Sequence, residues 1–328
     1  SSTRSVNSST MSGSASFGRW CGPASTKTTR WFGSTNTSAG RPARSARVYV
    51  VHSTPLCDSD DTISRTYTFM PPLSPVPGWA RGEVCRESTA ARVTVLDNVR
   101  GRLYRYEQAE SGWTRRQIPL PDNGSVAIGS VDATSGDAFV TFEDFVTPPT
   151  LYYVADGNPV PEAVKQQSPT FDGSRFEVSQ HWATSADGTR VPYFQVAPKG
   201  MVLDGSKPTH IFSYGGFRNA LVPSYSGSYE QLYGAYGKTW LERGGVFVLA
   251  NIRGGGEFGE AWHQGAVKAN HVRSFEDFEA VAADLIARKV TSKERLGIEG
   301  RSNGGLLVLS TMVRRPDLFG AVISGSPL

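Results

Sequence analysis

Residues 300–304 read Gly-Arg-Ser-Asn-Gly, and this pentapeptide limits the possible folds of the chain more than any other stretch. A short apolar run at 295–299 precedes it, and a second apolar run continues to about Arg314. Glycines on both sides of Ser302 allow a strand and a helix to approach closely across a sharp turn. The hydroxyl of a serine in such a turn is exposed at the edge of a sheet, beside a helix N-terminus that favours negative charge. The pattern therefore predicts Ser302 as a nucleophile.

Strand-like and helix-like patterns alternate from about Phe176 onward. The stretch 274–289 is amphipathic, with apolar residues at helical spacing, and Ser274 with Asp277 predicts a capping box at its start. Such alternation is typical of a mostly parallel sheet with helices on both faces, and a G-x-S-x-G turn within it is typical of an α/β-hydrolase. We therefore assign residues 173–328 to the N-terminal part of an α/β-hydrolase catalytic domain.

Residues 93–172 have a different sequence pattern, without the strand–helix alternation seen from Phe176 onward. They consist of short runs rich in β-branched and aromatic residues, each bounded by Gly, Asn, Asp or Pro. Such alternation of short strands and turns is typical of an all-β region. At about 40–45 residues for each four-stranded blade, the segment corresponds to about two blades of a β-propeller, too few to close one. The prediction is a partial β-propeller.

Residues 1–92 are low in complexity. Ser, Thr, Gly and Arg dominate the beginning, and no Asp or Glu occurs before Asp58. Neither strand nor helix periodicity is present, so the segment cannot bury enough apolar surface to offset its chain entropy. We expect a disordered or non-native segment; a targeting peptide, which is also Arg- and Ser-rich and poor in acids, is the alternative.

The composition argues against several classes of partner and cofactor. A net charge of +4 over 328 residues is too weak to predict nucleic-acid binding. No apolar run approaches the roughly 18–20 residues of a membrane-spanning helix. The cysteines, Cys21, Cys57 and Cys85, form no disulfide framework and no metal-binding pair, and zinc-ligand spacing is absent. We expect no metal, no nucleic-acid partner, no membrane partner and a cytoplasmic location.

Residues 254–259 match G-x-G-x-x-G after a strand, and Asp277 follows about twenty residues later, as in a dinucleotide-binding fingerprint. However, no helix opens directly after these glycines, and Asp277 falls in the first turn of the amphipathic helix rather than at a strand end. We therefore expect no cofactor.

Acyl transfer requires donors for the oxyanion. One is the backbone N–H of the residue after the serine, Asn303. The phenol of Tyr214, just past a buried strand in the stretch IFSYGGF, is the second expected donor, with an aromatic lid on the sheet as the alternative. The base is missing from this pattern, because all histidines precede Ser302, whereas the acid and the histidine of this fold follow the serine. We expect structural or surface roles for His52, His181, His210, His263 and His271.

Several segments in one order resemble the prolyl oligopeptidase family of serine peptidases. They are SYGGF, VLANIRGGGEFGEAWHQG, FEDFEAVAADLI, GRSNGGLL and RRPDLFGAVI. The resemblance covers about residues 180–328, with weaker support over 93–170. It implies an α/β-hydrolase domain capped by a propeller that admits only peptides and small unfolded chains. It also implies Ser302 as nucleophile, Tyr214 and the Asn303 amide as the oxyanion hole, and Phe217 with Asn303 beside the substrate.

The resemblance implies hydrolysis of short peptides, after proline, through an acyl-enzyme on Ser302. The family's aspartate and histidine lie on loops after two further strands that are absent from these residues, so we expect a fragment with little activity. Arg301 departs from the family, which commonly has glycine there. The segment 251–257 is interpreted as structural support beneath the site. The alternatives are oligopeptidase B-like cleavage after Lys or Arg, acylaminoacyl peptidase activity, and a non-catalytic pseudoenzyme or binding fragment.

Overall fold

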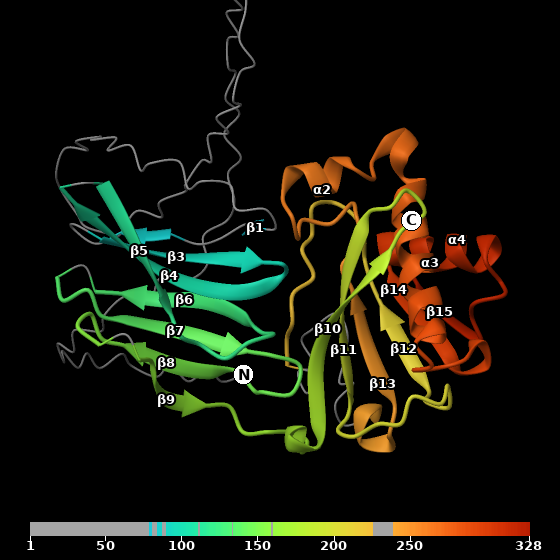
Figure 1. Cartoon of the computed structure of the whole chain (residues 1–328), viewed down its shortest axis with the longest axis horizontal. Coiled ribbons are helices and arrows are strands. Elements are labelled where there is room, and N and C mark those ends of the chain that lie inside the picture. Colours follow the sequence, from blue (N-terminus) through green and yellow to red (C-terminus); the bar gives the residue numbers. More distant parts are fainter. Residues whose placement is uncertain are drawn as a thin grey trace, which may run out of the picture. The chain divides into compact units, whose positions relative to one another are not determined.

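The structure is a computed structural model, drawn in Figure 1. All of the residues that it describes belong to one compact unit. The expectations for residues 1–78 fall outside the described part of the chain. The described residues are 79–80, 84–86, 90–110, 112–132, 134–158, 160–225 and 239–328.

The first sheet is antiparallel and is built on a meander of three strands, β3, β4 and β5. Two short strands, β1 and β2, pair with β3. Both lie in the stretch 79–92, where the sequence pattern predicted no strand, because each is too short to show a periodicity. The strands are β1 Trp79–Ala80, β2 Val84–Arg86, β3 Ala90–Asp97, β4 Arg100–Ala109 and β5 Gly112–Ile118.

The second sheet is a four-stranded antiparallel meander. Alternate residues of its strand β7 are buried, as expected for a strand with one face in a core. Leu103 and Ile118 of the first sheet share an apolar cluster with Val140 and Val154 of the second. The strands are β6 Ser125–Val131, β7 Ala138–Glu143, β8 Thr150–Val154 and β9 Glu162–Gln166.

The third sheet is mixed and has the strand order β10-β11-β13-β12-β14-β15. A turn with Gly188 at φ 83° joins β10 to β11, as the Asp187-Gly188 pair predicts, and these two strands are antiparallel. The strands from β13 to β15 pair in parallel, so the predicted parallel sheet forms most of this layer. The strands are β10 Phe176–Thr184, β11 Arg190–Pro198, β12 Thr209–Phe212, β13 Val246–Ala250, β14 Leu296–Arg301 and β15 Ala321–Gly325.

Each buried strand of this sheet sends alternate side chains to two different cores. Ile211 of β12 packs in one cluster with Phe278 of α3 and Leu307 of α4, whereas its neighbour Phe212 packs with Phe145 on the opposite face. Over the described residues, α3 and α4 both pack on the same face of the sheet (Figure 1). The predicted helices on the other face stay a prediction, because residues 226–238, between β12 and β13, lie outside the described part of the chain. The helices are α2 Glu260–Gln264, α3 Val272–Ala287 and α4 Asn303–Arg314, with 3₁₀ turns at Gly173–Arg175, Leu241–Arg243, Lys268–Asn270 and Lys293–Arg295.

The predicted capping box of α3 is wrong. The helix begins at Val272, with His271 as N-cap, so Ser274 lies inside the first turn and its hydroxyl donates to the carbonyl of His271 at 2.8 Å. The carboxylate of Asp277 instead accepts hydrogen bonds from Arg253. A buried guanidinium is a stronger partner for a buried carboxylate than a backbone N–H at a helix end.

No helix in the described part of the chain has the length and apolarity needed to cross a membrane.

Candidate active site

Ser302 lies at the turn between β14 and α4, as the sequence predicts. Its backbone has φ 55° and ψ −118°, a conformation that costs a residue with a side chain roughly 1–2 kcal/mol. The N–H of Ser302 donates to the carbonyl of Gly325 at 2.8 Å, and its own carbonyl accepts from the N–H of Gly305 at 2.9 Å. These bonds hold the strained turn, and the serine is only half-buried. Such strain is a recurrent feature of functional sites.

The glycines around Ser302 are required by close backbone contacts. A methyl group on Gly300 would overlap the carbonyl of Gly304, so strand and helix could not approach as they do. A methyl group on Gly304 would lie 2.7 Å from the carbonyl oxygen of Ser213, in the loop that follows β12. The pentapeptide therefore fixes both the sharp turn and the contact of α4 with the neighbouring loop.

Tyr214 and Asn303, the expected oxyanion donors, are brought together by a direct contact. The side-chain amide of Asn303 donates to the carbonyl oxygen of Tyr214 at 2.7 Å, and Asn303 is buried. Gly216 lies against the same amide, and any larger residue there would overlap it. The loop that carries Tyr214 is thus fastened to the first residue of α4.

Phe217 and Asn303, the expected substrate-binding residues, line one cavity of about 480 Å³. The ring of Phe217 lies 6.4 Å from that of Tyr214, and its side chain is 69% exposed, unusually open for a large apolar group. The backbone of Phe217 has a positive φ of 54°. An exposed aromatic ring held by a strained loop beside the serine turn is available to a ligand.

The glycine-rich segment after β13 supports this loop through backbone contacts. The carbonyl of Gly254 accepts from the N–H of Arg218, and the N–H of Gly256 donates to the carbonyl of Asn219, both at 3.3 Å. Side chains at either glycine would overlap the loop, at Gly215 and at Arg218. These contacts agree with the interpretation of residues 251–257 as support.

Arg253, within the supporting segment, is the centre of a buried charge cluster that sequence reasoning missed. Its guanidinium donates to Asp277 at 2.6 and 2.9 Å and also to Asp187, in the turn between β10 and β11. The side chain of Asp277 is fully buried, whereas that of Asp187 is 36% exposed. Hydrogen bonds from Arg253 hold the pKa of Asp187 far below its usual range. The cluster ties the supporting segment to α3 and to the β10–β11 turn.

Glu257 was also missed as an individual group. Its side chain is completely buried, and burial raises its pKa to about 7. One carboxyl oxygen accepts from the N–H of Leu221 at 2.9 Å, while Asn251 donates to the carbonyl of Leu221 at 2.7 Å. Together they fix the end of the loop that begins at Tyr214. The three consecutive glycines before Glu257 were the signal in the sequence, because they indicate a tightly packed backbone.

Two of the histidines have structural partners, as expected. Nε2 of His181 lies 2.8 Å from the hydroxyl oxygen of Ser179 and 3.4 Å from the guanidinium of Arg288, and burial lowers the pKa of His181. His210 stacks on Phe247, and its Nε2 lies 3.2 Å from a carboxylate oxygen of Glu299.

The next two histidines line the cavity that contains Asn303. Nδ1 of His263 lies 2.7 Å from the carbonyl oxygen of Gly254 and donates to it, and the ring of His271 lies 5.1 Å from that of Phe275. Across the described ranges, no histidine is hydrogen-bonded to the hydroxyl of Ser302. His52 lies outside the described residues.

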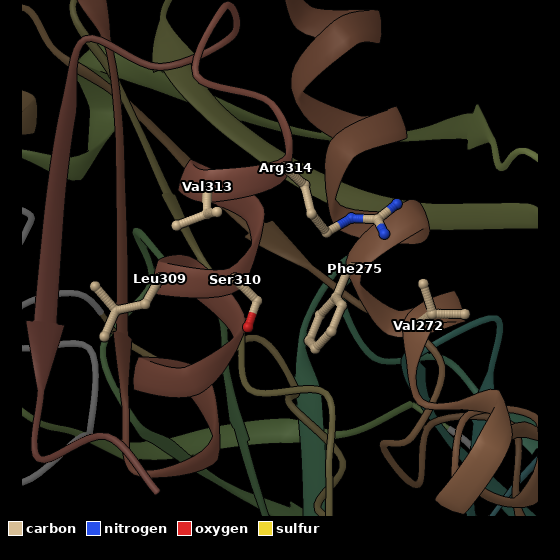
Figure 2. Close-up of a pocket in the computed structure, with 6 residues that line it drawn as sticks. All are labelled: Val272, Phe275, Leu309, Ser310, Val313 and Arg314. Carbon is tan, nitrogen blue, oxygen red and sulfur yellow. The ribbon is translucent and has the colours of Figure 1, made fainter.

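A second hollow lies between α3 and α4 (Figure 2). Its walls are mostly apolar, and its one guanidinium, that of Arg314, is bound to Glu279. It contains no pair of groups that could transfer a proton to or from a substrate, so it is not the reacting site. The residues that line it are Val272, Phe275, Leu309, Ser310, Val313 and Arg314.

The sequence of this chain is similar to those of known peptidases. The sequence model of the prolyl oligopeptidase family matches residues 234–328. An uncharacterized peptidase of Sinorhizobium fredii is 44% identical over 236 residues, which are 72% of this chain and 32% of that protein. A prolyl endopeptidase of Elizabethkingia meningoseptica is 37% identical over 218 residues, 66% of this chain and 30% of that protein. The chain spans about a third of the length of these relatives.

Solved structures of peptidases from the same family also align with this chain. A post-proline cleaving enzyme from Rickettsia typhi aligns with a TM-score of 0.67 and 34% identity, over 77% of this chain and 36% of that one. Prolyl oligopeptidase B from Galerina marginata, bound to a 25mer macrocyclization substrate, aligns with a TM-score of 0.64 and 30% identity, over 76% of this chain and 34% of that one. The chain therefore belongs to the prolyl oligopeptidase family of serine peptidases.

Proposed function

We propose that this chain carries the nucleophile, the oxyanion donors and part of the substrate pocket of a serine peptidase that cleaves short peptides after proline. The observation that carries the proposal is the strained turn at Ser302, beside the hydrogen bond that joins Asn303 to the Tyr214 loop. A serine in this conformation has no structural need for a hydroxyl, since small residues fill tight turns equally well. A nucleophile at a strand-to-helix turn does need it.

In this mechanism the hydroxyl oxygen of Ser302 attacks the carbonyl carbon of the scissile bond and transfers its proton to a base. The carbonyl oxygen becomes an oxyanion, which accepts hydrogen bonds from the backbone N–H of Asn303 and the phenol of Tyr214. Collapse of the tetrahedral intermediate breaks the C–N bond, and the base protonates the leaving amine. Water then hydrolyses the acyl-enzyme and restores the serine.

Cleavage after proline is favoured by the lining of the cavity beside Ser302. Phe217 contributes an exposed aromatic wall, and no carboxylate is among the described residues that line the cavity. A site that selects Lys or Arg before the scissile bond requires such a carboxylate to pair with the cation. The prolyl endopeptidase and the post-proline cleaving enzyme among the similar proteins support the same preference.

We further propose that the base and its orienting acid are supplied from outside these 328 residues, so that the chain alone has little activity. The placement of His181 and His210 on the sheet, each with other partners, supports this division. The alternative candidates for the base within the chain are His263 and His271, because they line the cavity together with Asn303.

The domain organisation follows from the same proposal. The antiparallel strands from β3 to β9 would form blades of a propeller in the region assigned to residues 93–172, with β1 and β2 pairing onto β3 from the preceding stretch. Residues 173–328 would be the first part of the hydrolase domain. Hydrogen bonds cross this boundary, from the N–H of Tyr225 to Glu143 at 2.8 Å and from Asn123 to the carbonyl of Val178 at 3.2 Å.

The test is a chimera in which the matched part of this chain, 66% of its length, replaces the corresponding 218-residue region of the Elizabethkingia meningoseptica prolyl endopeptidase. Hydrolysis of a proline-linked chromogenic substrate is measured for the chimera, its Ser302→Ala variant and the 328-residue chain alone. We expect activity in the chimera, loss of at least about a thousandfold in Ser302→Ala, and little activity in the chain alone.

Inactivity of a folded chimera, with no labelling of Ser302 by a fluorophosphonate, would reject the peptidase proposal and favour a pseudoenzyme. Strong activity of the chain alone, abolished by Ser302→Ala, would place the base within the chain, and His263→Ala and His271→Ala would then identify it. Substrates with arginine or an acetylated amino acid before the scissile bond distinguish proline cleavage from the oligopeptidase B-like and acylaminoacyl activities.

A further inference from the structure

We propose that the cavity beside Asn303 binds a carboxylate of the peptide substrate, with Lys268 and His271 as its principal basic residues. The inference rests on the proposed function, because it assigns the charge of the peptides that this site prefers. The cavity lies between the loop that carries Phe217 and the segment from His263 to His271, and its volume of about 480 Å³ is within the usual range for a ligand site.

The charge of the lining is one-sided. Four of the residues that border the cavity carry basic side chains, and none of the described residues that border it is acidic. A concave surface lined by one sign of charge attracts ligands of the opposite sign. The basic residues are Arg218, His263, Lys268 and His271.

These four side chains differ in how strongly they are already engaged. Arg218 is paired with Glu260 at 2.8 Å, although both side chains are more than half exposed. His263 donates from Nδ1 to the carbonyl of Gly254, which leaves Nε2 as its second polar atom. Across the described ranges, Lys268 has no ion-pair partner, and His271 has no hydrogen-bond partner for its ring. Lys268 and His271 are therefore the groups best able to accept an anionic ligand.

Three of the residues that line the cavity have a strained backbone. Phe217, Arg218 and Lys268 all have positive φ angles between 54° and 58°, and all three line the cavity. Non-glycine residues in this conformation occur preferentially at ligand-binding and catalytic sites. The three residues lie on two separate segments that border the same cavity.

The remaining walls favour a peptide over a small inorganic anion. Phe217, Ala266 and Val267 provide apolar surface within the same cavity. A peptide can place its side chains against this surface while its carboxylate pairs with Lys268, and a bare phosphate gains nothing from it. Because Asn303 follows Ser302 directly, a carboxylate held here is close to the scissile bond. Its source is either the C-terminus of a short peptide or an acidic side chain.

The experiment measures binding to the full 328-residue chain in the Ser302→Ala background, so that no cleavage can occur. Three peptides of equal length are compared by calorimetry at low ionic strength: acetyl-Ala-Gly-Pro-Ala with a free C-terminal acid, the same peptide as its amide, and acetyl-Ala-Gly-Pro-Glu amide. We expect one of the two carboxylate peptides to bind about five- to tenfold more tightly than the neutral amide, and salt to reduce the difference. Which of the two binds more tightly identifies the source of the carboxylate.

Lys268→Gln should remove most of this preference, and adding His271→Gln should remove the rest. Lys199→Gln is the matched control, because Lys199 is exposed, directly follows β11 and does not border the cavity, so it should leave the preference intact. Equal binding of all three peptides would overturn the inference, and so would a preference that Lys199→Gln reduces as much as Lys268→Gln. Because this assay measures no cleavage, its failure is distinct from inactivity of the chimera, which tests the proposed function.

Discussion

The side-chain amide of Asn303 donates a 2.7 Å hydrogen bond to the backbone carbonyl of Tyr214. The two groups proposed to stabilise the oxyanion, the N–H of Asn303 and the phenol of Tyr214, are therefore held by one contact between α4 and the loop after β12. Electrostatic stabilisation of a transition state depends on donors that are fixed before the reaction begins. The bond gives the Asn303 side chain a positioning role in addition to that of its backbone.

Asn303→Leu should slow acylation of Ser302, because it keeps the backbone N–H but releases the Tyr214 loop and leaves a buried carbonyl without its donor. We expect a decrease of about 10- to 100-fold in kcat/KM of the chimera, corresponding to the loss of about 1–3 kcal/mol. The fluorophosphonate labelling rate should fall in parallel. Asn158→Leu, at an exposed position in the loop between β8 and β9 and away from the cavity, is the control. A variant as active as the parent would show that the loop needs no such tie.

Gly300→Ala should destroy the serine turn, because the new methyl group would overlap the carbonyl of Gly304, and neither backbone can move away. We expect a loss of about 2–4 kcal/mol in the free energy of unfolding, measured by urea denaturation. Gly297→Ala, on the same strand, is the matched control. Its nearest neighbours would lie at 3.8 Å, an ordinary contact, so its cost should remain below about 1 kcal/mol. Similar losses in the two variants would contradict this account.

Asp277→Asn should be strongly destabilising, because it leaves the buried guanidinium of Arg253 without its main counter-charge. The two side chains are 0% and 6% exposed, and breaking such a pair costs about 3–5 kcal/mol. Asp187→Asn, which removes the more exposed partner of the same arginine, should cost about 1 kcal/mol or less. Urea unfolding of both variants measures the difference, and a larger loss in Asp187→Asn would reverse the assigned order.

The site was predictable from the sequence where its geometry depends on neighbouring residues. The turn at Ser302 is fixed by the glycines on either side, and the β10–β11 hairpin by the Asp187-Gly188 pair, so each could be recognised within a few residues. The contact between Tyr214 and Asn303 could be expected only through the resemblance to a family, because 89 residues separate the two in the sequence.

The features that were missed depend on tertiary contacts. Asp277 looked like a cap because its spacing from Ser274 fits one, but Arg253 approaches it from 24 residues away and takes the carboxylate. The burial of Glu257 follows from how the loop packs, and no local pattern encodes it. The face of the sheet opposite α3 and α4 is covered by residues such as Phe145, which belong to a different part of the chain.

Glu257→Gln should change how stability depends on pH. The folded state raises the pKa of Glu257 to about 7, above its ordinary value of 4.5, because the carboxyl group is completely buried. Its favourable contribution is therefore fully present below about pH 4.5 and is lost as the pH rises toward 7, where the unfolded chain is ionised but the folded chain resists ionisation. The parent should lose about 2–3 kcal/mol across this interval through this group.

Glutamine retains an oxygen that can accept from the N–H of Leu221 and carries no ionisable proton, so the variant should show a flatter profile and exceed the parent in stability at pH 8. Urea unfolding at pH 4.5, 6 and 8 measures this, with Glu242→Gln as a control at a partly exposed position. The control should follow the parent's profile. If Glu257→Gln also followed it, the carboxyl group would have to be ionised in the folded state, and the unpaired oxygen next to Gly255 would then have to be stabilised by a donor such as a buried water.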